Sequence, residues 1–310
     1  MSGGTGSAAD YRAGFAALVG RPNAGKSTLT NALVGQKVAI TSSKPQTTRH
    51  AIRGIRHTSD SQLVLVDTPG LHRPRSLLGQ RLNDLVRETL LGVDVIGFCL
   101  PADQRPGPGD QYIAADLKEL QRARRVPVVA LATKVDTVDR GRLAEHLIAI
   151  DQLADWDEIV PCSAVRGQQV AEVGDVLASY LPTSPPLYPA DAITDEPHVV
   201  MIAELVREAA LEGVRDELPH SLAVVVEEIL ERPDRPADKP MSDVRVNVFV
   251  ERPSQKAIVI GRGGSRLRDV GTAARTQIEE LMGQRVYLDL HVKVAKDWQR
   301  DPKQLGRLGF

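Results

Sequence analysis

The sequence predicts an α/β domain with a mixed, mostly parallel sheet, followed by a smaller α+β domain. The chain has 310 residues, more than a single hydrophobic core usually holds. Short apolar runs alternate with amphipathic stretches as far as residue 182, and prolines then recur up to residue 197. We therefore predict a flexible tail at 1–12, a first domain at 13–182, a linker at 183–197 and a second domain at 198–310.

Apolar runs in the first domain are strand candidates, and helical patterns lie between most of them. Buried strands that alternate with helices form a mainly parallel sheet covered on both faces. The second and third candidates have no helix between them, so we expect them to form an antiparallel pair. The strand candidates are Phe15–Val19, Ile52–Arg56, Leu63–Val66, Val93–Leu100, Val126–Ala132 and Ile159–Pro161. The helix candidates are Ser76–Leu90, Asp110–Arg122, Leu143–Leu153 and Val170–Tyr180.

The second domain has a different order of elements. An amphipathic stretch comes first, two strand candidates follow, and a glycine turn then separates a short apolar segment from a long helical pattern. The short segment fits either a strand or the end of a helix. In chain order the candidates are Val199–Glu217, Leu222–Leu230, Val244–Val250, Ile258–Ile260, Leu267–Met282 and Val286–Val294. This α-β-β-α-α-β order is that of a type II K-homology (KH) domain.

Composition indicates a globular protein without a strong overall charge. Apolar residues make up 42% of the chain, charged residues make up 25%, and the formal net charge is −1, so any nucleic-acid site must come from local clustering. Cys99 and Cys162 lie in apolar runs and are expected to be reduced core residues. The sequence shows no signal peptide and no apolar run of ~18–20 residues. We expect a cytoplasmic protein without a transmembrane segment.

The segment after the first strand candidate has the pattern of a phosphate-binding loop. It reads G-x-x-x-x-G-K-S and leads into a helical stretch that opens at Thr28. Its glycines allow consecutive N–H groups to point at phosphate oxygens, and the helix N-terminus adds partial positive charge. We expect Lys26 to reach the β- and γ-phosphates and Ser27 to bind Mg²⁺. The loop residues are Gly20, Arg21, Pro22, Asn23, Ala24, Gly25, Lys26 and Ser27.

A second phosphate-sensing segment follows the third strand candidate. It comprises Asp67, Thr68, Pro69 and Gly70, followed by Leu71. Asp67 is expected to hold Mg²⁺ and the N–H of Gly70 to sense the γ-phosphate, which makes the segment a nucleotide-dependent switch. On its own, the same tetrapeptide would also fit a plain turn.

Between these segments, residues 40–49 are polar and have the composition of a mobile switch loop. A threonine there is expected to close over Mg²⁺ and the γ-phosphate. The pattern does not distinguish Thr47 from Thr48.

A third segment predicts guanine as the base. Thr133, Lys134, Val135 and Asp136 follow a buried strand candidate and resemble N-K-x-D, with threonine in place of asparagine. A carboxylate accepts hydrogen bonds from both N1–H and the exocyclic amine of guanine, and adenine offers neither donor there. Because a hydroxyl lacks the reach of an amide, we expect somewhat weaker guanine binding.

A serine–alanine pair completes the guanine site. Ser163 and Ala164 follow the next strand candidate, and the Ala164 N–H is available to guanine O6.

The residue after Gly70 is Leu71, whose side chain cannot orient a water molecule by hydrogen bonding. Hydrolysis should therefore depend on Lys26, Mg²⁺ and backbone dipoles, at an intrinsic rate well below one per second.

The glycine turn of the second domain predicts contact with single-stranded RNA. A G-x-x-G turn that leads into a helix lets a nucleic-acid backbone approach closely. Arginines cluster at this turn, although such a cluster is often only a solvated surface. With aromatic residues at 4%, base stacking is not expected to dominate. The candidate RNA-binding residues are Ile260, Gly261, Arg262, Gly263, Gly264, Arg266 and Arg268.

Taken in order, these motifs resemble the Era family of bacterial GTPases, over Gly14 to Phe310. Further segments carry the resemblance: Lys44–His50, Asp67–His72 and Val292–Val294 with Trp298 and Leu308–Phe310. The resemblance implies a P-loop GTPase domain followed by a type II KH domain, GTP hydrolysis with Mg²⁺, and Thr48 as the switch threonine.

The resemblance also implies partners. It implies binding to the 3′ end of 16S ribosomal RNA, a role in 30S subunit assembly, and peripheral contact with the inner face of the cell membrane. No DNA partner is expected. Two alternatives are a P-loop ATPase or nucleotide kinase, against which Asp136 argues, and an RNA-binding factor that binds nucleotide without hydrolysing it.

Overall fold

The structure is a computed structural model that describes residues 11–42, 48–74, 76–214, 221–233, 235–236 and 238–310. The chain divides into two compact units. Of the described residues, the first unit contains those up to Ala39 and those within Thr48–Arg73 and Leu82–Asp195, and the second contains those within Glu196–Phe310, Ile40–Thr47 and Pro74–Arg81. Each unit has its own hydrophobic core.

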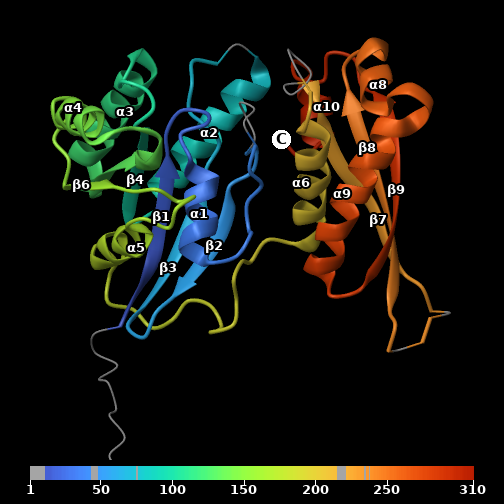
Figure 1. Cartoon of the computed structure of the whole chain (residues 1–310), viewed down its shortest axis with the longest axis horizontal. Helices are drawn as coiled ribbons and strands as arrows, with labels where there is room; N and C mark the ends of the chain where they lie inside the picture. The colour runs from blue at the N-terminus through green and yellow to red at the C-terminus, as the bar shows by residue number, and fades with distance from the viewer. Residues whose placement is uncertain (1–10, 43–47, 75, 215–220, 234, 237) are drawn as a thin grey trace, which may run out of the picture. The chain divides into compact units, whose positions relative to one another are not determined.

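A mixed sheet forms the centre of the first unit (Figure 1). Its strand order is β2-β3-β1-β4-β5-β6. Neighbouring strands are parallel except β2 and β3, which pair antiparallel as predicted. The strands are β1 Arg12–Val19, β2 Ile52–His57, β3 Ser61–Asp67, β4 Val95–Pro101, β5 Val128–Thr133 and β6 Glu158–Pro161.

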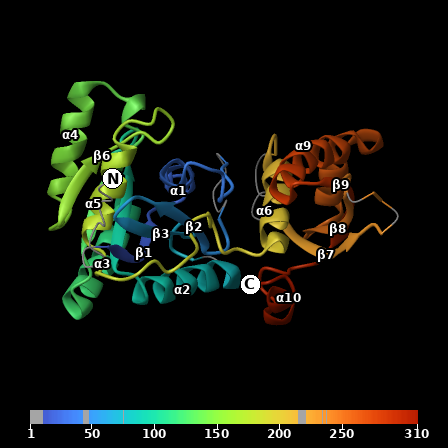
Figure 2. The same ribbon diagram turned by 90° about the horizontal axis from the view of Figure 1, so that it is seen from below.

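Helices cover both faces of this sheet. On one face, Leu29 of α1 and Leu177 of α5 pack with Leu18 and Leu131 of the strands. On the other face, apolar side chains of α2, α3 and α4 pack around Phe98. Figure 2 shows α1 and α2 on opposite sides of the sheet. The helices are α1 Lys26–Val34, α2 Leu77–Leu91, α3 Pro108–Arg124, η1 Val135–Thr137, α4 Arg140–Asp151 and α5 Val170–Ser179.

The proline-rich segment expected to be a linker is hydrogen-bonded to the first unit up to residue 195. The side chain of Gln62 is fully buried and accepts the N–H groups of Leu187 and Tyr188 at 2.7 and 2.9 Å. It also donates to the carbonyl of Tyr188 at 2.9 Å. The N–H of Ile55 in β2 donates to the carbonyl of Ile193 at 2.9 Å. We call residues 183–195 the strap, because they run along the sheet edge as part of this unit.

The second unit has the order expected of a type II KH domain. Strand β8 pairs antiparallel with β7 and parallel with β9. Helices α6 and α9 pack on the sheet, with Val206 and Ala274 in the common core. The elements are α6 His198–Leu211, β7 Ala223–Glu231, β8 Met241–Val250, α8 Pro253–Ile260, η2 Arg262–Gly264, α9 Ser265–Met282, β9 Arg285–Val294 and α10 Pro302–Arg307.

The structure resolves or revises several expectations. The apolar segment Ile258–Ile260 is the end of helix α8, which begins with Pro253 at its first position, where a missing N–H costs nothing. The end of the predicted helix Val199–Glu217 lies partly outside the described residues, and α6 ends at Leu211. Arg12, assigned to the tail, begins β1, whereas residues 1–10 lie outside the described part. In the described ranges, no helix has the length and apolarity that a membrane span requires.

Candidate nucleotide site and RNA groove

The predicted phosphate-binding loop connects β1 to α1. Gly20 and Gly25 have backbone φ angles of 151° and 90°, which residues with a side chain rarely adopt. A Cβ on Gly20 would also lie 2.7 Å from the carbonyl oxygen of Cys99. Lys26 is the first residue of α1, so the N–H groups of the loop lie directly before the free N–H groups of a helix N-terminus. The loop therefore has the geometry of a phosphate cradle.

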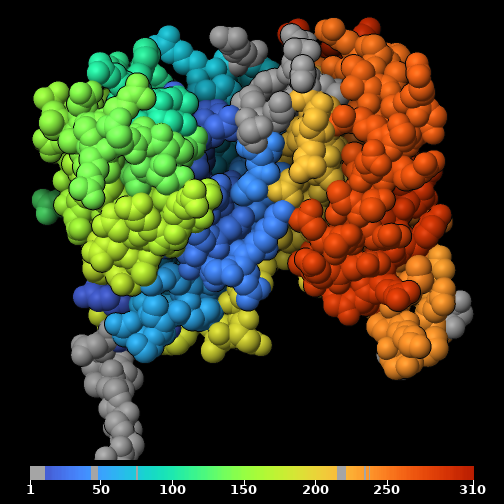
Figure 3. Space-filling model, in the orientation of Figure 1, coloured from blue at the N-terminus to red at the C-terminus, as the bar shows by residue number. Residues whose placement is uncertain are grey.

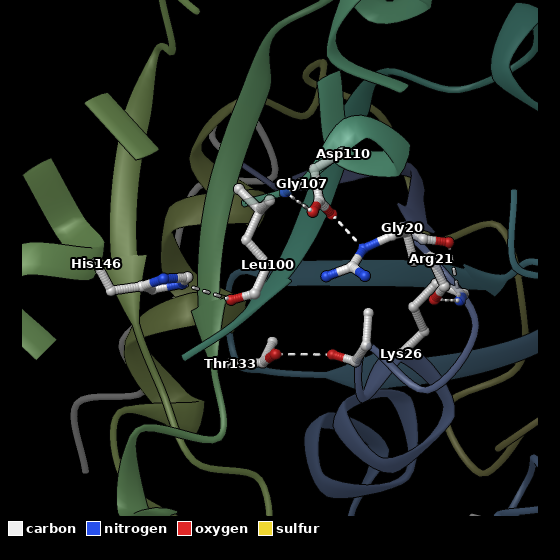
Figure 4. Close-up of polar contacts among 9 residues, drawn as sticks. Gly20, Arg21, Lys26, Leu100, Gly107, Asp110, Thr133 and His146 are labelled. Carbon is white, nitrogen blue, oxygen red and sulfur yellow. Dashed lines mark hydrogen bonds and ion pairs between the residues drawn. The ribbon is translucent and has the colours of Figure 1, made fainter. Parts of the chain in front are cut away.

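The Lys26 ammonium group lies inside this loop. Its Nζ donates to the carbonyls of Gly20 at 3.2 Å and Arg21 at 3.0 Å (Figure 4). Burial lowers the pKa of Lys26, and the charge of Asp67 opposes that shift. The charge of Asp67 thus helps to keep the lysine a cation, which is the form needed to neutralise a phosphate.

Three predicted metal ligands converge beside the loop. The Ser27 hydroxyl lies 2.6 Å from Asp67 Oδ2 and 2.9 Å from the Thr48 hydroxyl, and Thr48 lies 3.2 Å from the same carboxylate oxygen. Two hydroxyls and a carboxylate form the hard oxygen set that Mg²⁺ prefers, together with phosphate and water. These residues therefore fit the ion. Thr48 is in place in this site, whereas Thr47 lies outside the described residues.

The second switch segment lies against the phosphate loop. The Thr68 hydroxyl donates to the carbonyl of Leu18 at 2.7 Å. A Cβ on Gly70 would lie 2.6 Å from the backbone nitrogen of Pro22, so only glycine permits this approach. The N–H of Leu71 donates to the carbonyl of Gly20 at 3.1 Å, while the Leu71 side chain is buried in the core. As expected, Leu71 cannot orient water.

The predicted base-binding residues line one cavity of about 140 Å³. Asp136 is exposed, and its Oδ1 accepts the hydroxyl of Ser163 at 2.5 Å. Lys134 also lines the cavity, and its Nζ lies 3.2 Å from Asp103. The lining residues are Gly25, Thr28, Leu29, Thr133, Lys134, Asp136, Thr137, Cys162, Ser163, Ala164 and Val165.

Thr133 contacts the phosphate loop through its side chain. Its hydroxyl donates to the carbonyl of Ala24 at 2.7 Å (Figure 4). The base cavity and the phosphate loop are therefore linked through a buried hydrogen bond. The neighbouring Val135 is buried in the core, so it supports the site without lining it.

In the second unit, the glycine turn joins α8 to α9. Gly261, Gly263 and Gly264 all have positive φ, at 73°, 59° and 77°. A Cβ on Gly261 would lie 2.7 Å from Cβ of Arg266, whereas a Cβ on Gly263 meets nothing within 4 Å. The turn is thus compact on one side and open on the other.

The three arginines at this turn differ in their surroundings. Arg262 and Arg268 are exposed. Arg266 instead donates through Nη2 to the carbonyls of Ala210 and Glu212 at 3.2 and 2.5 Å, and so binds the end of α6. Ile260 is half-buried and packs against the hydrophobic core of the second unit. The structure therefore leaves Arg262 and Arg268, but not Arg266, free to face a ligand.

A groove of about 330 Å³ lies beside the turn, between α9 and β9. Leu267 at the start of α9 lines it, whereas Val270 is in the core and Ile258 of α8 is 52% exposed outside the groove. Figure 3 shows α9, in dark orange, on the face of the second unit that is turned toward the viewer. The lining residues are Gly264, Leu267, Arg268, Gly271, Thr272, Arg275, Tyr287, Leu288 and Leu290.

Arg275 and Tyr287 in this groove were not predicted. Arg275 follows Arg268 by seven residues on α9, so helical spacing places the two on one face. That spacing was the available signal. Tyr287 is 54% exposed, and the guanidinium of Arg232 lies 5.5 Å from its ring centre.

Comparisons with known proteins match both units of the chain. A family model described as 50S ribosome-binding GTPase matches residues 15–134, and a KH domain model matches residues 217–299. GTPase Era of Streptomyces coelicolor is 67% identical over 305 residues, and the match covers 97% of this chain and 95% of that protein. The chain belongs to the Era family of GTPases.

Other members of the Era family give the same result. GTPase Era of Mycobacterium avium is 62% identical, with 97% of this chain and 99% of that protein covered. A crystal structure of Era in complex with MgGDPNP and nucleotides 1506–1542 of 16S ribosomal RNA matches with a TM-score of 0.90, at 35% identity over 96% of this chain and 99% of that one. A point variant of Aquifex aeolicus Era bound to GDP·AlF4⁻ also matches with a TM-score of 0.90, at 36% identity, covering 96% and 99%.

Proposed function

We propose that this GTPase binds the 3′ end of 16S ribosomal RNA through its KH domain and assists assembly of the 30S subunit, with GTP favouring the RNA-bound state. The main support is the match over nearly the full length of both chains to an Era solved with a magnesium-bound GTP analogue and that RNA. The groove beside the G-x-x-G turn supplies a matching surface on this chain.

We further propose how the residues of the first unit bind and hydrolyse GTP. The N–H groups of the phosphate loop and the Lys26 ammonium hold the β- and γ-phosphates. Ser27, Thr48 and Asp67 would hold Mg²⁺, which supplies positive charge to the phosphate oxygens. The N–H of Gly70 senses the γ-phosphate, and its contact with Pro22 transmits the loss of that group to the second switch segment. Asp136 selects guanine.

On the KH domain, backbone and bases are contacted by different residues in our proposal. Exposed Arg262, Arg268 and Arg275 provide charge for phosphates, and the open side of the glycine turn admits the backbone. The aliphatic groove residues and Tyr287 face the bases. One exposed tyrosine allows one stacking contact, while hydrogen bonds to base edges provide the remaining selectivity.

The RNA proposal is tested by fluorescence anisotropy with labelled 16S 3′-end RNA, a scrambled RNA of equal length, and GDP or a GTP analogue. We expect tighter binding of the native sequence and a further increase in affinity with the GTP analogue. Gly263→Asp should weaken binding at least tenfold, because a carboxylate enters the phosphate path.

Gly283→Asp is the matched control for that variant. Gly283 has a φ of 63° and open space around it, but lies at the far end of α9. It should therefore reproduce the backbone strain without the loss of RNA binding. Equal affinities for native and scrambled RNA would contradict the proposal.

The description of the matching GTPase family model favours a second candidate, association with the 50S subunit. The KH groove and the solved rRNA complex make the small subunit our first choice. Sucrose-gradient sedimentation with purified 30S and 50S subunits separates the two. Co-migration with 50S alone would favour the second candidate.

We propose that the protein acts in the cytoplasm, with peripheral contact at the inner face of the cell membrane. The proposal rests on the family resemblance. Flotation with anionic lipid vesicles tests the membrane contact, which we expect to be weakened by salt. Absence of the protein from the vesicle fraction at low salt would limit its place to the cytoplasm.

A further inference from the structure

A fully buried carboxylate joins the phosphate loop to helix α3. Asp110 has a side-chain exposure of 0%. Its Oδ2 accepts the N–H of Gly107, which caps the helix, and its Oδ1 accepts Nε of Arg21 at 2.7 Å (Figure 4). Arg21 is the first residue of the phosphate loop after Gly20. One carboxylate thus serves both a helix cap and a loop side chain.

Arg21 is held at both its side chain and its backbone. The guanidinium is fixed by Asp110, and a Cβ on Gly109 would lie 2.7 Å from Arg21 Cδ, so α3 also packs against the arginine stem. At the backbone, the carbonyl of Arg21 accepts Lys26 Nζ at 3.0 Å and the N–H of Ala24 at 3.3 Å. The residue whose side chain is held by α3 is therefore also the residue whose carbonyl oxygen contacts the phosphate-binding lysine.

Helix capping alone does not explain this arrangement. A cap needs one oxygen, which asparagine or serine supplies without charge. A carboxylate removed from water is costly unless it is paired, and here the paired cation is Arg21 of the nucleotide site. The buried charge at this position is explained by the loop that it holds.

We propose that Asp110 and Arg21 are positioning residues for GTP: the Asp110–Arg21 pair fixes the start of the phosphate loop so that its N–H groups and Lys26 are preorganised for the β- and γ-phosphates. The inference extends the nucleotide site described above. It assigns a role to α3, which contributes no residue to the predicted motifs.

The test measures the Kd of GDP and of a GTP analogue by fluorescence titration, together with thermal unfolding, for Arg21→Met, Asp110→Asn and the double variant. We expect each single change to raise both Kd values roughly tenfold, and the double variant to be no weaker than the weaker single variant. Arg21→Lys should restore part of the affinity. The ratio of Kd values for IDP and GDP should stay unchanged, because Asp136 reads the base.

Gly109→Ala displaces Arg21 without changing either member of the pair. Alanine is the better helix residue, which offsets part of the stability lost when buried Asp110 loses its partner, and thermal unfolding measures the net change. Its methyl group displaces Arg21, so nucleotide affinity should fall. A purely structural pair would leave nucleotide affinity unchanged in this variant.

Arg105→Met and Glu145→Gln are matched controls. They remove an ion pair of 3.3 Å on the same unit, in which Arg105 is 88% exposed, and should leave nucleotide binding unchanged. Nucleotide Kd values within twofold of the parent for Arg21→Met and Asp110→Asn would overturn the proposal. Additive free-energy losses of nucleotide binding in the double variant would overturn it as well. Failure of the parent itself to bind GDP would instead refute the nucleotide site.

Discussion

At the scale of single residues, Thr133 shows how a shorter side chain serves in a base-reading motif. Its hydroxyl donates to the carbonyl of Ala24, so the motif is hydrogen-bonded to the phosphate loop despite the shorter side chain. The reduced guanine affinity expected from the sequence stays a prediction.

Removal of this hydroxyl should weaken nucleotide binding. Thr133→Val keeps the shape but leaves the carbonyl of Ala24 without this donor, so we expect the Kd of GDP to rise about fivefold, equivalent to roughly 1 kcal/mol. Isothermal titration calorimetry measures the change. Thr89→Val is the control, because it removes a similar hydroxyl–carbonyl bond of 2.8 Å in α2. Equal losses in both variants would refute a specific role for Thr133.

His146 predicts a pH dependence of stability. Burial lowers its pKa from the usual 6.5, while its bond to the carbonyl of Leu100 and the charges of Asp110 and Asp103 oppose the shift. In the folded protein the ring thus stays neutral to lower pH than in the unfolded chain. The stability that the neutral His146 ring contributes is complete above about pH 6.5 and is lost as the pH falls towards the pKa of the folded state.

Urea unfolding at pH 7.5 and 5.5 tests this dependence. The parent should be less stable at pH 5.5, and His146→Gln should show a smaller difference between the two conditions. An identical pH dependence in parent and variant would assign the effect to other groups. Exposed His291 provides a control through His291→Gln.

At the scale of elements, the strap residues 183–195 differ most from what the sequence indicates. The prolines predict an extended linker, whereas the segment contains a turn closed by the N–H of Ala192 on the carbonyl of Pro189 and is hydrogen-bonded to the first unit. The anchor is Gln62, whose amide forms hydrogen bonds with Leu187 and Tyr188. Sequence patterns describe local conformation, so they do not reveal a fixed partner more than a hundred residues away.

Gln62→Ala should release this anchor. The change removes three hydrogen bonds and leaves buried polar groups of the strap without the amide, so we expect a loss of roughly 2–4 kcal/mol in the free energy of unfolding. Chemical denaturation measures the loss, and limited proteolysis should show cleavage within the strap. Gln111→Ala, at an exposed position of α3, should have little effect on either.

Motifs define the candidate nucleotide site more closely than the candidate RNA groove. A phosphate loop needs particular residues at fixed offsets, so Lys26, Asp67 and Asp136 can be named from the sequence alone, and their roles stay predictions. The RNA groove depends on which faces of α9 and β9 meet. Tyr287 lines it because the pairing of β9 with β8 fixes which side chains of β9 lie beside α9. Arg266 is predicted to bind RNA because it is a basic residue at the glycine turn, but its hydrogen-bond partners are carbonyls at the end of α6, which is distant in sequence.

At the scale of the whole molecule, both thiols lie inside the first unit. Cys99 and Cys162 are 0% and 1% exposed, and burial raises the pKa of Cys162 to about 12. Because the thiolate is the reactive form, the folded protein should not react with a thiol reagent at pH 8. The unfolded chain should react with two equivalents of the reagent, one for each cysteine. Rapid reaction of the native protein would contradict this burial.

The distribution of the two tryptophans has a practical consequence. Trp156 packs against Phe98 in the first unit, and Trp298 is fully buried beside Phe310 in the second. Each unit therefore contains its own intrinsic fluorophore. With Trp156→Phe or Trp298→Phe, emission from the remaining indole reports the melting of one unit alone, so calorimetric peaks can be assigned without external dyes.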